Sequence, residues 1–157
     1  MIIRRATPGD LADYAAIVEA AYAPYVPRMG RKPAPMLDDH AARVRDGEAW
    51  VAEVGGAVAG IAVLIDAPDH LLLDNIAVAA GHRRTGVGRA LLGFAEAEAV
   101  RRGQPEVRLY TNETMVENIA LYGRIGYVEV SRTLQKGFKR VFFRKPVAQS
   151  RTMEIPG

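Results

Sequence analysis

Three arginines and two glycines are gathered around one turn, at Arg83, Arg84, Gly86, Gly88 and Arg89. The turn precedes a segment whose apolar residues have helical spacing, which puts it at a helix N-terminus. Such a terminus leaves about four backbone N–H groups without partners and carries a partial positive charge. Glycines let an anion approach that backbone closely. The turn is therefore suited to bind a pyrophosphate, and a purely structural turn is the alternative.

Two common phosphate-binding motifs do not fit this turn. A P-loop requires a lysine followed by serine or threonine after its glycines, and none stands there. The dinucleotide fingerprint requires a third glycine, but Leu91 occupies that position. A dinucleotide-binding domain would also place the turn after its first strand, whereas this turn follows the fourth predicted strand.

A second pair of chemically useful residues is Asn118 and Tyr122, four residues apart in a predicted helix. This spacing puts both side chains on one helix face. A phenol with a pKa of about 10 can donate a proton or a hydrogen bond to a leaving thiolate, whose thiol has a pKa of about 8.5. A half-buried tyrosine with its hydroxyl at the surface is the alternative interpretation.

The elements that must position these residues alternate between strands and helices. Apolar runs between turn residues predict strands, and helical spacing predicts helices. We predict a strand at 2–5, helices from 7 to before 24 and at 38–45, strands at 48–54, 57–65 and 71–78, a helix at 87–102, a strand at 107–110, a helix at 113–124, and paired strands at 127–130 and 138–143. This order predicts an α/β domain with a mixed sheet.

The composition is that of a globular domain. Of 157 residues, 49% are hydrophobic and 25% are charged, and no apolar run approaches the roughly 20 residues of a membrane helix. We expect one domain over residues 1–146 and a weakly ordered tail over 147–157. The N-terminus lacks the pattern of a secretory signal, so a cytoplasmic location without membrane attachment is expected.

The chain contains no cysteine, which excludes disulfides, thiolate metal sites and an acyl group resting on a protein thiol. The three histidines, His40, His70 and His82, lack metal-ligand spacing, so no metal is expected. The net charge of +3 favours anionic partners. Because the basic residues form a small cluster, a polyphosphate ligand is favoured over nucleic acid.

The turn and the Asn118–Tyr122 pair together resemble the GNAT superfamily of N-acetyltransferases. Arg83, Gly86 and Gly88 match its [QR]-x-x-G-x-[GA] acetyl-CoA motif, with arginine in place of the commoner glutamine. Residues 118–127 are similar to its second signature, an asparagine four residues before a tyrosine and then a glycine–aromatic pair. The resemblance extends over roughly residues 2–145. It implies an α/β domain of the α+β type, with a mostly antiparallel sheet of about seven strands and about four helices.

The resemblance also implies acetyl-CoA as the acyl donor. The strand before the turn would offer backbone groups to the pantetheine arm, and the amides of residues 84–89 would hold the pyrophosphate. Asn118 would hydrogen-bond near the pantetheine, and Tyr122 would be the general acid near the sulfur. The cofactor-binding residues are then Ile76, Val78, Ala80, Arg83, Arg84, Thr85, Gly86, Val87, Gly88, Arg89 and Asn118.

An amine acceptor must lose a proton before it attacks, since amines have pKa values of about 8 to 10.4. Asp74 interrupts an apolar strand and is one candidate base. A carboxylate satisfied by backbone or arginine partners is the alternative. Glu113, at the end of the next strand, is a second candidate, and ordered water is a third route.

The acceptor-binding residues are expected in the segment from Tyr22 to Met36 and in the hairpin around Leu134 to Phe138. Residues 24–36 of the first segment are predicted to form an irregular, basic, proline-rich loop. The first segment is longer than most connections, and a linker between two helices is its alternative role. Tyr22, Tyr25 and Arg28, with Arg31, could bind a carboxylate or an aromatic group. An arginine there could equally bind the adenosine 3′-phosphate or solvate the loop.

The sequence thus predicts acetyl transfer from acetyl-CoA to a primary amine, with a small or amino-acid-like acceptor favoured. Transfer to a protein N-terminus or lysine and a non-catalytic acyl-CoA sensor are the alternatives. A regulator that binds ATP or NAD is a third class. The oligomeric state stays open, and homodimers are common in the superfamily that the chain resembles.

Overall fold

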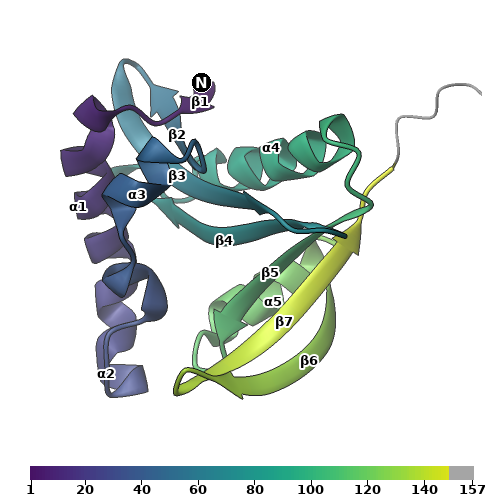
Figure 1. The fold of residues 1–157 in the computed structure, drawn as a ribbon. Helices are drawn as coiled ribbons and strands as arrows, with labels where there is room; N and C mark the ends of the chain where they lie inside the picture. Colours follow the sequence, from purple (N-terminus) through teal and green to yellow (C-terminus); the bar gives the residue numbers. More distant parts are fainter. Residues whose placement is uncertain (149–157) are drawn as a thin grey trace, which may run out of the picture.

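Seven strands form a single sheet within residues 1–148, the part of the chain that the computed structural model describes (Figure 1). Their bounds are β1 (Ile2–Arg5), β2 (Ala49–Val54), β3 (Ala57–Asp66), β4 (Leu71–Val78), β5 (Glu106–Asn112), β6 (Val128–Gln135) and β7 (Phe138–Pro146). Their spatial order is β1-β2-β3-β4-β5-β7-β6, and only β4 and β5 pair in parallel. The predicted mixed, mostly antiparallel sheet is confirmed.

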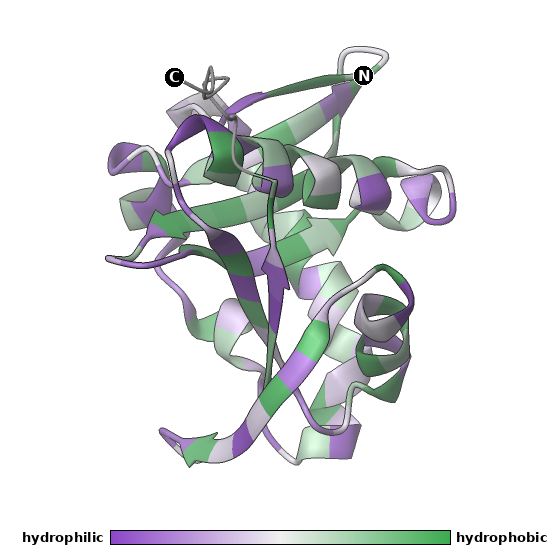
Figure 2. Ribbon diagram, turned by 90° about the vertical axis from the view of Figure 1, so that its right-hand side faces the viewer, coloured by the Kyte–Doolittle hydropathy of each residue, from purple (hydrophilic) through white to green (hydrophobic). Residues whose placement is uncertain are grey.

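Helices cover both faces of this sheet. They are α1 (Leu11–Tyr22), α2 (Val26–Met29), α3 (His40–Arg45), α4 (Val87–Arg101) and α5 (Val116–Arg124). Leu91 of α4 and Tyr122 of α5 pack in one core with Leu71 of β4, whereas Ile17 of α1 packs with Ile61 of β3 on the other side. Because helices cover both faces, the central strands are predominantly hydrophobic (Figure 2). The predicted α/β architecture is confirmed.

The contact between β3 and α4 depends on one glycine. A Cβ atom added at Gly60 would lie 2.9 Å from Cγ1 of Val87 and 3.0 Å from Cδ1 of Leu91, which is closer than carbon atoms pack. Gly60 therefore lets the first turn of α4 lie directly on the sheet, and this fixes the position of the preceding loop.

A β-bulge in β4 changes the face of the sheet toward which its side chains point. Leu73 pairs with Leu64 and Asn75 pairs with Val63, so Asp74 is the extra residue. Leu73 packs on the side of α4, whereas the odd-numbered residues after the bulge pack on the side of α1. Asp74 and Asn75 consequently both contact residues of the α1 and α3 layer.

The strands β4 and β5 pair over only three residues each, ending at Leu73 and Leu109. Beyond this point β4 continues to Val78 and β5 to Asn112 without pairing to each other, and Figure 1 shows the two strands diverging. The sheet therefore opens in its middle, so that side chains and backbone groups of both strands become available there.

The structure corrects the expectation of an irregular segment at 24–36. This segment contains α2 and two 3₁₀ turns, at Ala23–Tyr25 and Ala34–Leu37, and each has a proline among its first two residues. The fixed φ of proline suits the first positions of a helical turn, where its missing N–H is not needed. The prolines therefore start short turns here.

Several predicted boundaries also shift. The helix predicted at 113–124 begins only at Val116, because Oδ1 of Asn112 accepts hydrogen bonds from the amide and the hydroxyl of Thr114, at 3.0 and 2.9 Å. The final hairpin is longer than predicted, with β6 reaching Gln135 and β7 reaching Pro146. Of the tail expected at 147–157, residues 149–157 lie outside the described residues.

Candidate active site

A cleft of about 650 Å³ lies at the N-terminus of α4, between β4, α5 and the end of α1. We call it the long cleft. Ile76 and Val78 line it from β4, Asn118 and Tyr122 line it from α5, and the loop before α4 supplies Arg83. The turn and the Asn118–Tyr122 pair thus line one space, although 30 positions separate Gly88 from Asn118 in the sequence.

The start of α4 presents free backbone amides to this cleft. Gly86 is the N-cap residue with φ +92°, and Arg84 has φ 62°, so the chain reverses tightly before the helix. The first amide bonded within the turn is that of Ala90, which donates to the carbonyl of Gly86 at 2.9 Å. The amides of the three preceding helical residues are therefore available to an anion.

The predicted cofactor-binding residues divide into two groups. Those that line the long cleft are Ile76, Val78, Arg83, Arg84, Gly86, Gly88, Arg89 and Asn118. The other three have different surroundings: Val87 is buried in the core, the hydroxyl of Thr85 donates to the carbonyl of His82, and Ala80 begins a 3₁₀ turn. None of these three residues lines the cleft with its side chain, so only their backbone groups could bind a ligand there.

A cavity of about 50 Å³, which we call the central cavity, occupies the opening between β4 and β5. Tyr22, Ile76, Asn118 and Tyr122 line both the central cavity and the long cleft. The two spaces therefore adjoin, and the α5 pair stands where they meet.

Tyr122 is buried, and its hydroxyl is not used by the described part of the fold. The side chain is only 6% exposed, and within residues 1–148 no partner bonds its hydroxyl. Burial, with a smaller contribution from Tyr25, raises the pKa of Tyr122 to about 12. The phenol is therefore protonated at neutral pH, on a residue that lines both spaces.

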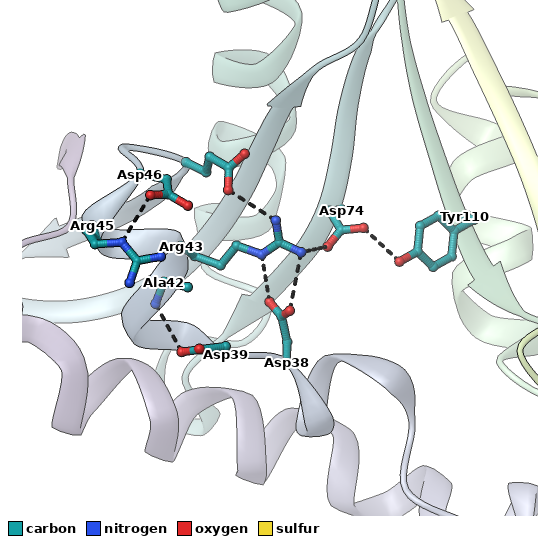
Figure 3. A network of polar contacts seen from close by, with 9 residues as sticks. Asp38, Asp39, Ala42, Arg43, Arg45, Asp46, Asp74 and Tyr110 are labelled. Atoms are coloured by element: carbon teal, nitrogen blue, oxygen red, sulfur yellow. Dashed lines mark hydrogen bonds and ion pairs between the residues drawn. The ribbon is translucent and has the colours of Figure 1, made fainter.

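Asp74 belongs to a polar network on the other side of the opening (Figure 3). Its Oδ1 accepts a hydrogen bond of 2.7 Å from Tyr110, and its Oδ2 lies 3.5 Å from Nη2 of Arg43. Arg43 also pairs with Asp38 and Glu48, at 3.0 and 3.1 Å. The Asp74 carboxylate is thus held by partners, as the alternative interpretation of the sequence expected, while it still lines the central cavity.

Glu113 lies apart from this constellation. Its side chain is 38% exposed, its carboxylate lies 3.6 Å from Nζ of Lys139, and the residue lines two surface hollows that Tyr122 does not line. The structure therefore brings Asp74, and not Glu113, to the cavity that Tyr122 lines.

The four residues expected to bind the acceptor are largely engaged with the protein itself. The Tyr22 hydroxyl donates to Oδ1 of Asn75 at 2.7 Å, and Arg28 pairs with Glu117 at 2.8 Å and lies over the Tyr25 ring. Arg31 stacks over Phe138, 4.0 Å from the ring centroid. Of the four, only Tyr22 lines the central cavity.

A third space, of about 640 Å³, is lined by residues of the diverging strands β4 and β5, and we call it the open groove. It shares Asp74, Asn75, Tyr110 and Arg140 with the central cavity. The central cavity can therefore be approached from two sides, by the open groove and by the long cleft. Asn75, Tyr110 and Arg140 are not among the site residues predicted from the sequence. Asn75 could have been noticed as a second polar residue in an apolar strand. Nothing in the local sequence distinguishes Tyr110 or Arg140.

No three histidine or acidic side chains lie close enough to hold a metal ion in the described part of the chain. No helix among residues 1–148 is long and apolar enough to cross a lipid bilayer.

Comparisons with known proteins identify the family. A model of the acetyltransferase (GNAT) family matches residues 14–127. N-acetyltransferase family 8 member 3 from Rattus norvegicus is 36% identical over 84 residues, which are 50% of this chain and 37% of that protein. The chain spans less than half the length of the curated relatives that it matches.

Solved structures share the fold over nearly the whole chain. The ribosomal-protein-S18-alanine N-acetyltransferase from Escherichia coli is similar with a TM-score of 0.74 and 22% identity, over 97% of each chain. The ribosomal-protein-alanine N-acetyltransferase from Brucella melitensis is similar with a TM-score of 0.69 and 26% identity, over 94% of this chain and 100% of that chain. Because the family match spans the α4 turn and the Asn118–Tyr122 pair, this chain belongs to the acetyltransferase (GNAT) family.

Proposed function

We propose that the protein transfers an acetyl group from acetyl-CoA directly to a primary amine. The observation that carries this proposal is the position of Tyr122, which lines both the anion-binding long cleft and the central cavity that reaches Asp74. Direct transfer is consistent with the absence of cysteine from the chain, since no protein thiol can hold the acyl group.

The long cleft offers the groups that a CoA molecule would need. The free amides at the start of α4 and the side chains of Arg83, Arg84 and Arg89 supply donors and positive charge for a pyrophosphate. Gly88 adds no side chain to the wall that Val78 lines, where a Cβ atom would lie 3.4 Å from Cγ2 of Val78. Bound acetyl-CoA would supply the thioester carbonyl that an amine attacks.

Tyr122 would donate the proton that the departing sulfur needs. Its raised pKa keeps the phenol protonated, and its hydroxyl has no partner among the described residues that would compete for the proton. General acid catalysis of this kind contributes typically about 10²–10⁴-fold to a rate.

Asp74 would hold the acceptor amine and receive its proton, directly or through water. Its carboxylate lines the central cavity and is oriented by Tyr110, so the receiving oxygen is fixed relative to the opening between the strands. Asn118, which lines both spaces, would orient the pantetheine end.

A protein amino terminus is the second candidate acceptor. The proteins from Escherichia coli and Brucella melitensis that share the fold carry the name of ribosomal-protein alanine N-acetyltransferases, and the open groove adjoins the central cavity at Asp74, Asn75 and Tyr110. A non-catalytic acyl-CoA sensor would have no use for the free Tyr122 hydroxyl.

Binding and turnover test the proposal separately. Thermal melts with CoA, ATP and NAD should show CoA as the most stabilising ligand, by about 2.7 kcal/mol at 100 times its dissociation constant. Thiol release from acetyl-CoA is then measured with small amines and with peptides. Stabilisation by CoA without thiol release on any acceptor would identify a sensor, and preference for ATP or NAD would refute the proposal.

A further inference from the structure

Arg140 of β7 is the arginine of the open groove that has no acidic partner. Arg43 pairs with three carboxylates, and Arg108 pairs with Glu106 at 2.6 Å. The polar bond of Arg140 is to the neutral amide oxygen of Gln135, at 3.1 Å, and no carboxylate in residues 1–148 lies within ion-pair distance of it. The Arg140 guanidinium therefore brings an uncompensated positive charge to the groove and to the central cavity.

Aromatic rings orient this guanidinium. Its Cζ atom lies 4.4 Å from the centroid of the Tyr110 ring and 5.6 Å from that of Phe138. Stacking leaves the planar edge of a guanidinium free to bind an anion with two parallel hydrogen bonds. The hydroxyl of the same Tyr110 ring bonds Asp74. Tyr110 therefore contacts a cation, Arg140, with its ring face and an anion, Asp74, with its hydroxyl. The two opposite charges are separated by about the length of one tyrosine side chain.

A buried amide adds an unused donor beside this pair. Asn75 is only 4% exposed and lines both the central cavity and the open groove. The Tyr22 hydroxyl bonds its Oδ1, and its Nδ2 has no partner among the described residues. A buried donor without a partner lowers the stability of the fold by about 1–3 kcal/mol. We therefore expect a bound molecule to supply the hydrogen-bond acceptor that Nδ2 of Asn75 lacks.

We propose that the acceptor is a small amine that carries a carboxylate, such as an amino acid, and that Arg140 binds this carboxylate. The proposal rests on the acetyl transfer proposed above and names its substrate class. The amine lies toward Asp74 in the central cavity, and Nδ2 of Asn75 donates to an oxygen of the acceptor. A dianionic phosphate is disfavoured because Asp74 lies close by, and a peptide amino terminus would leave Arg140 unpaired.

The test compares each acceptor with its own carboxamide. Alanine and β-alanine are assayed beside alaninamide and β-alaninamide by thiol release, with the wild type and with Arg140→Gln and Arg140→Lys. We expect a higher kcat/KM for the carboxylates in the wild type. Arg140→Gln should lower this preference by about 10- to 100-fold while carboxamide turnover stays within about 3-fold, and Arg140→Lys should retain part of it.

Two controls make the outcome specific. Arg144→Gln changes an arginine of the same strand that pairs with Glu106 and lines none of the three spaces, so the preference should not change. Equal turnover of carboxylates and carboxamides by wild type and Arg140→Gln, turnover of peptides alone, or a loss of preference in Arg31→Gln instead would overturn the assignment. Absence of both CoA binding and thiol release would instead refute the acetyl transfer itself.

Discussion

The hydroxyl of Tyr110 donates a hydrogen bond of 2.7 Å to Oδ1 of Asp74 across the point where β4 and β5 begin to separate. Tyr110 and Asp74 directly follow Leu109 and Leu73, the last residues that pair the two strands. A side-chain hydrogen bond thus replaces the backbone ladder at the mouth of the opening. The same bond fixes the carboxylate that faces the central cavity.

This bond allows the charge of Asp74 to be tested apart from its orientation. Asp74→Asn keeps an oxygen that Tyr110 can bond but loses the negative charge, so kcat/KM for amines should fall by about 100-fold. Tyr110→Phe keeps the charge and the Arg43 contact, so its loss should stay below about 10-fold. Steady-state thiol release measures both. Unchanged activity of Asp74→Asn would assign proton removal to ordered water.

Removal of the Tyr122 hydroxyl should affect turnover and little else. Tyr122→Phe should lower kcat by about 10²-fold or more, because the proton donor is lost. Its melting temperature should stay close to that of the wild type, since the hydroxyl bonds no other described residue. Tyr127→Phe is the matched control, because the Tyr127 hydroxyl faces Glu96 at 3.4 Å and lines none of the three spaces. Equal kcat in both variants would remove Tyr122 from the mechanism.

The raised pKa of Tyr122 sets the alkaline side of the pH profile. The acid role requires the protonated phenol, which is present below the pKa of about 12 and is lost only as pH rises through it. We therefore expect kcat to show no alkaline decrease between pH 7 and 10. Measurement of kcat in this range, on wild type and Tyr122→Phe, checks this. A decrease near pH 9 in the wild type that the variant lacks would contradict it.

Two glycines of the α4 region should respond in opposite ways to alanine. Gly86 has φ +92° at the N-cap, so Gly86→Ala should destabilise the fold by about 1–2 kcal/mol and weaken CoA binding. Gly93 is exposed inside α4, and a Cβ atom there would contact nothing within 4 Å. Gly93→Ala should therefore stabilise by about 0.5–1 kcal/mol. Denaturant unfolding gives both values, and a stable Gly86→Ala would show that the left-handed turn is dispensable.

Local patterns in the chain were enough to predict the order of the strands and of α1, α3, α4 and α5, and a glycine-containing turn at the start of α4. Alternation identifies strands, helical spacing identifies α4, and Gly86 and Gly88 mark a close backbone approach. These signals arise within one segment, so no distant residue is needed to interpret them. The Asn118–Tyr122 pair likewise needs only the period of one helix.

The acceptor side could not be assigned in this way. The sequence favoured Arg28 and Arg31 because they are basic and lie in a long loop, yet Arg28 pairs with Glu117, and Arg31 stacks on Phe138. A local pattern does not reveal which charges neutralise one another, since the partners come from other elements. Arg140 lies in an ordinary strand pattern, and nothing in its neighbouring residues indicates a binding role.

Residue type and spacing alone therefore predicted the helix-start turn at Arg83 to Gly88 and the shared helix face of Asn118 and Tyr122, both of which line the long cleft. The chemical roles of these residues stay predictions. Tertiary structure decided the rest. The bulge at Asp74 turns two neighbouring polar side chains toward one side, and the separation of β4 from β5 brings them to Tyr110 and Arg140. The physical reason is that strand register and the pairing of distant charges depend on the packing of the whole sheet.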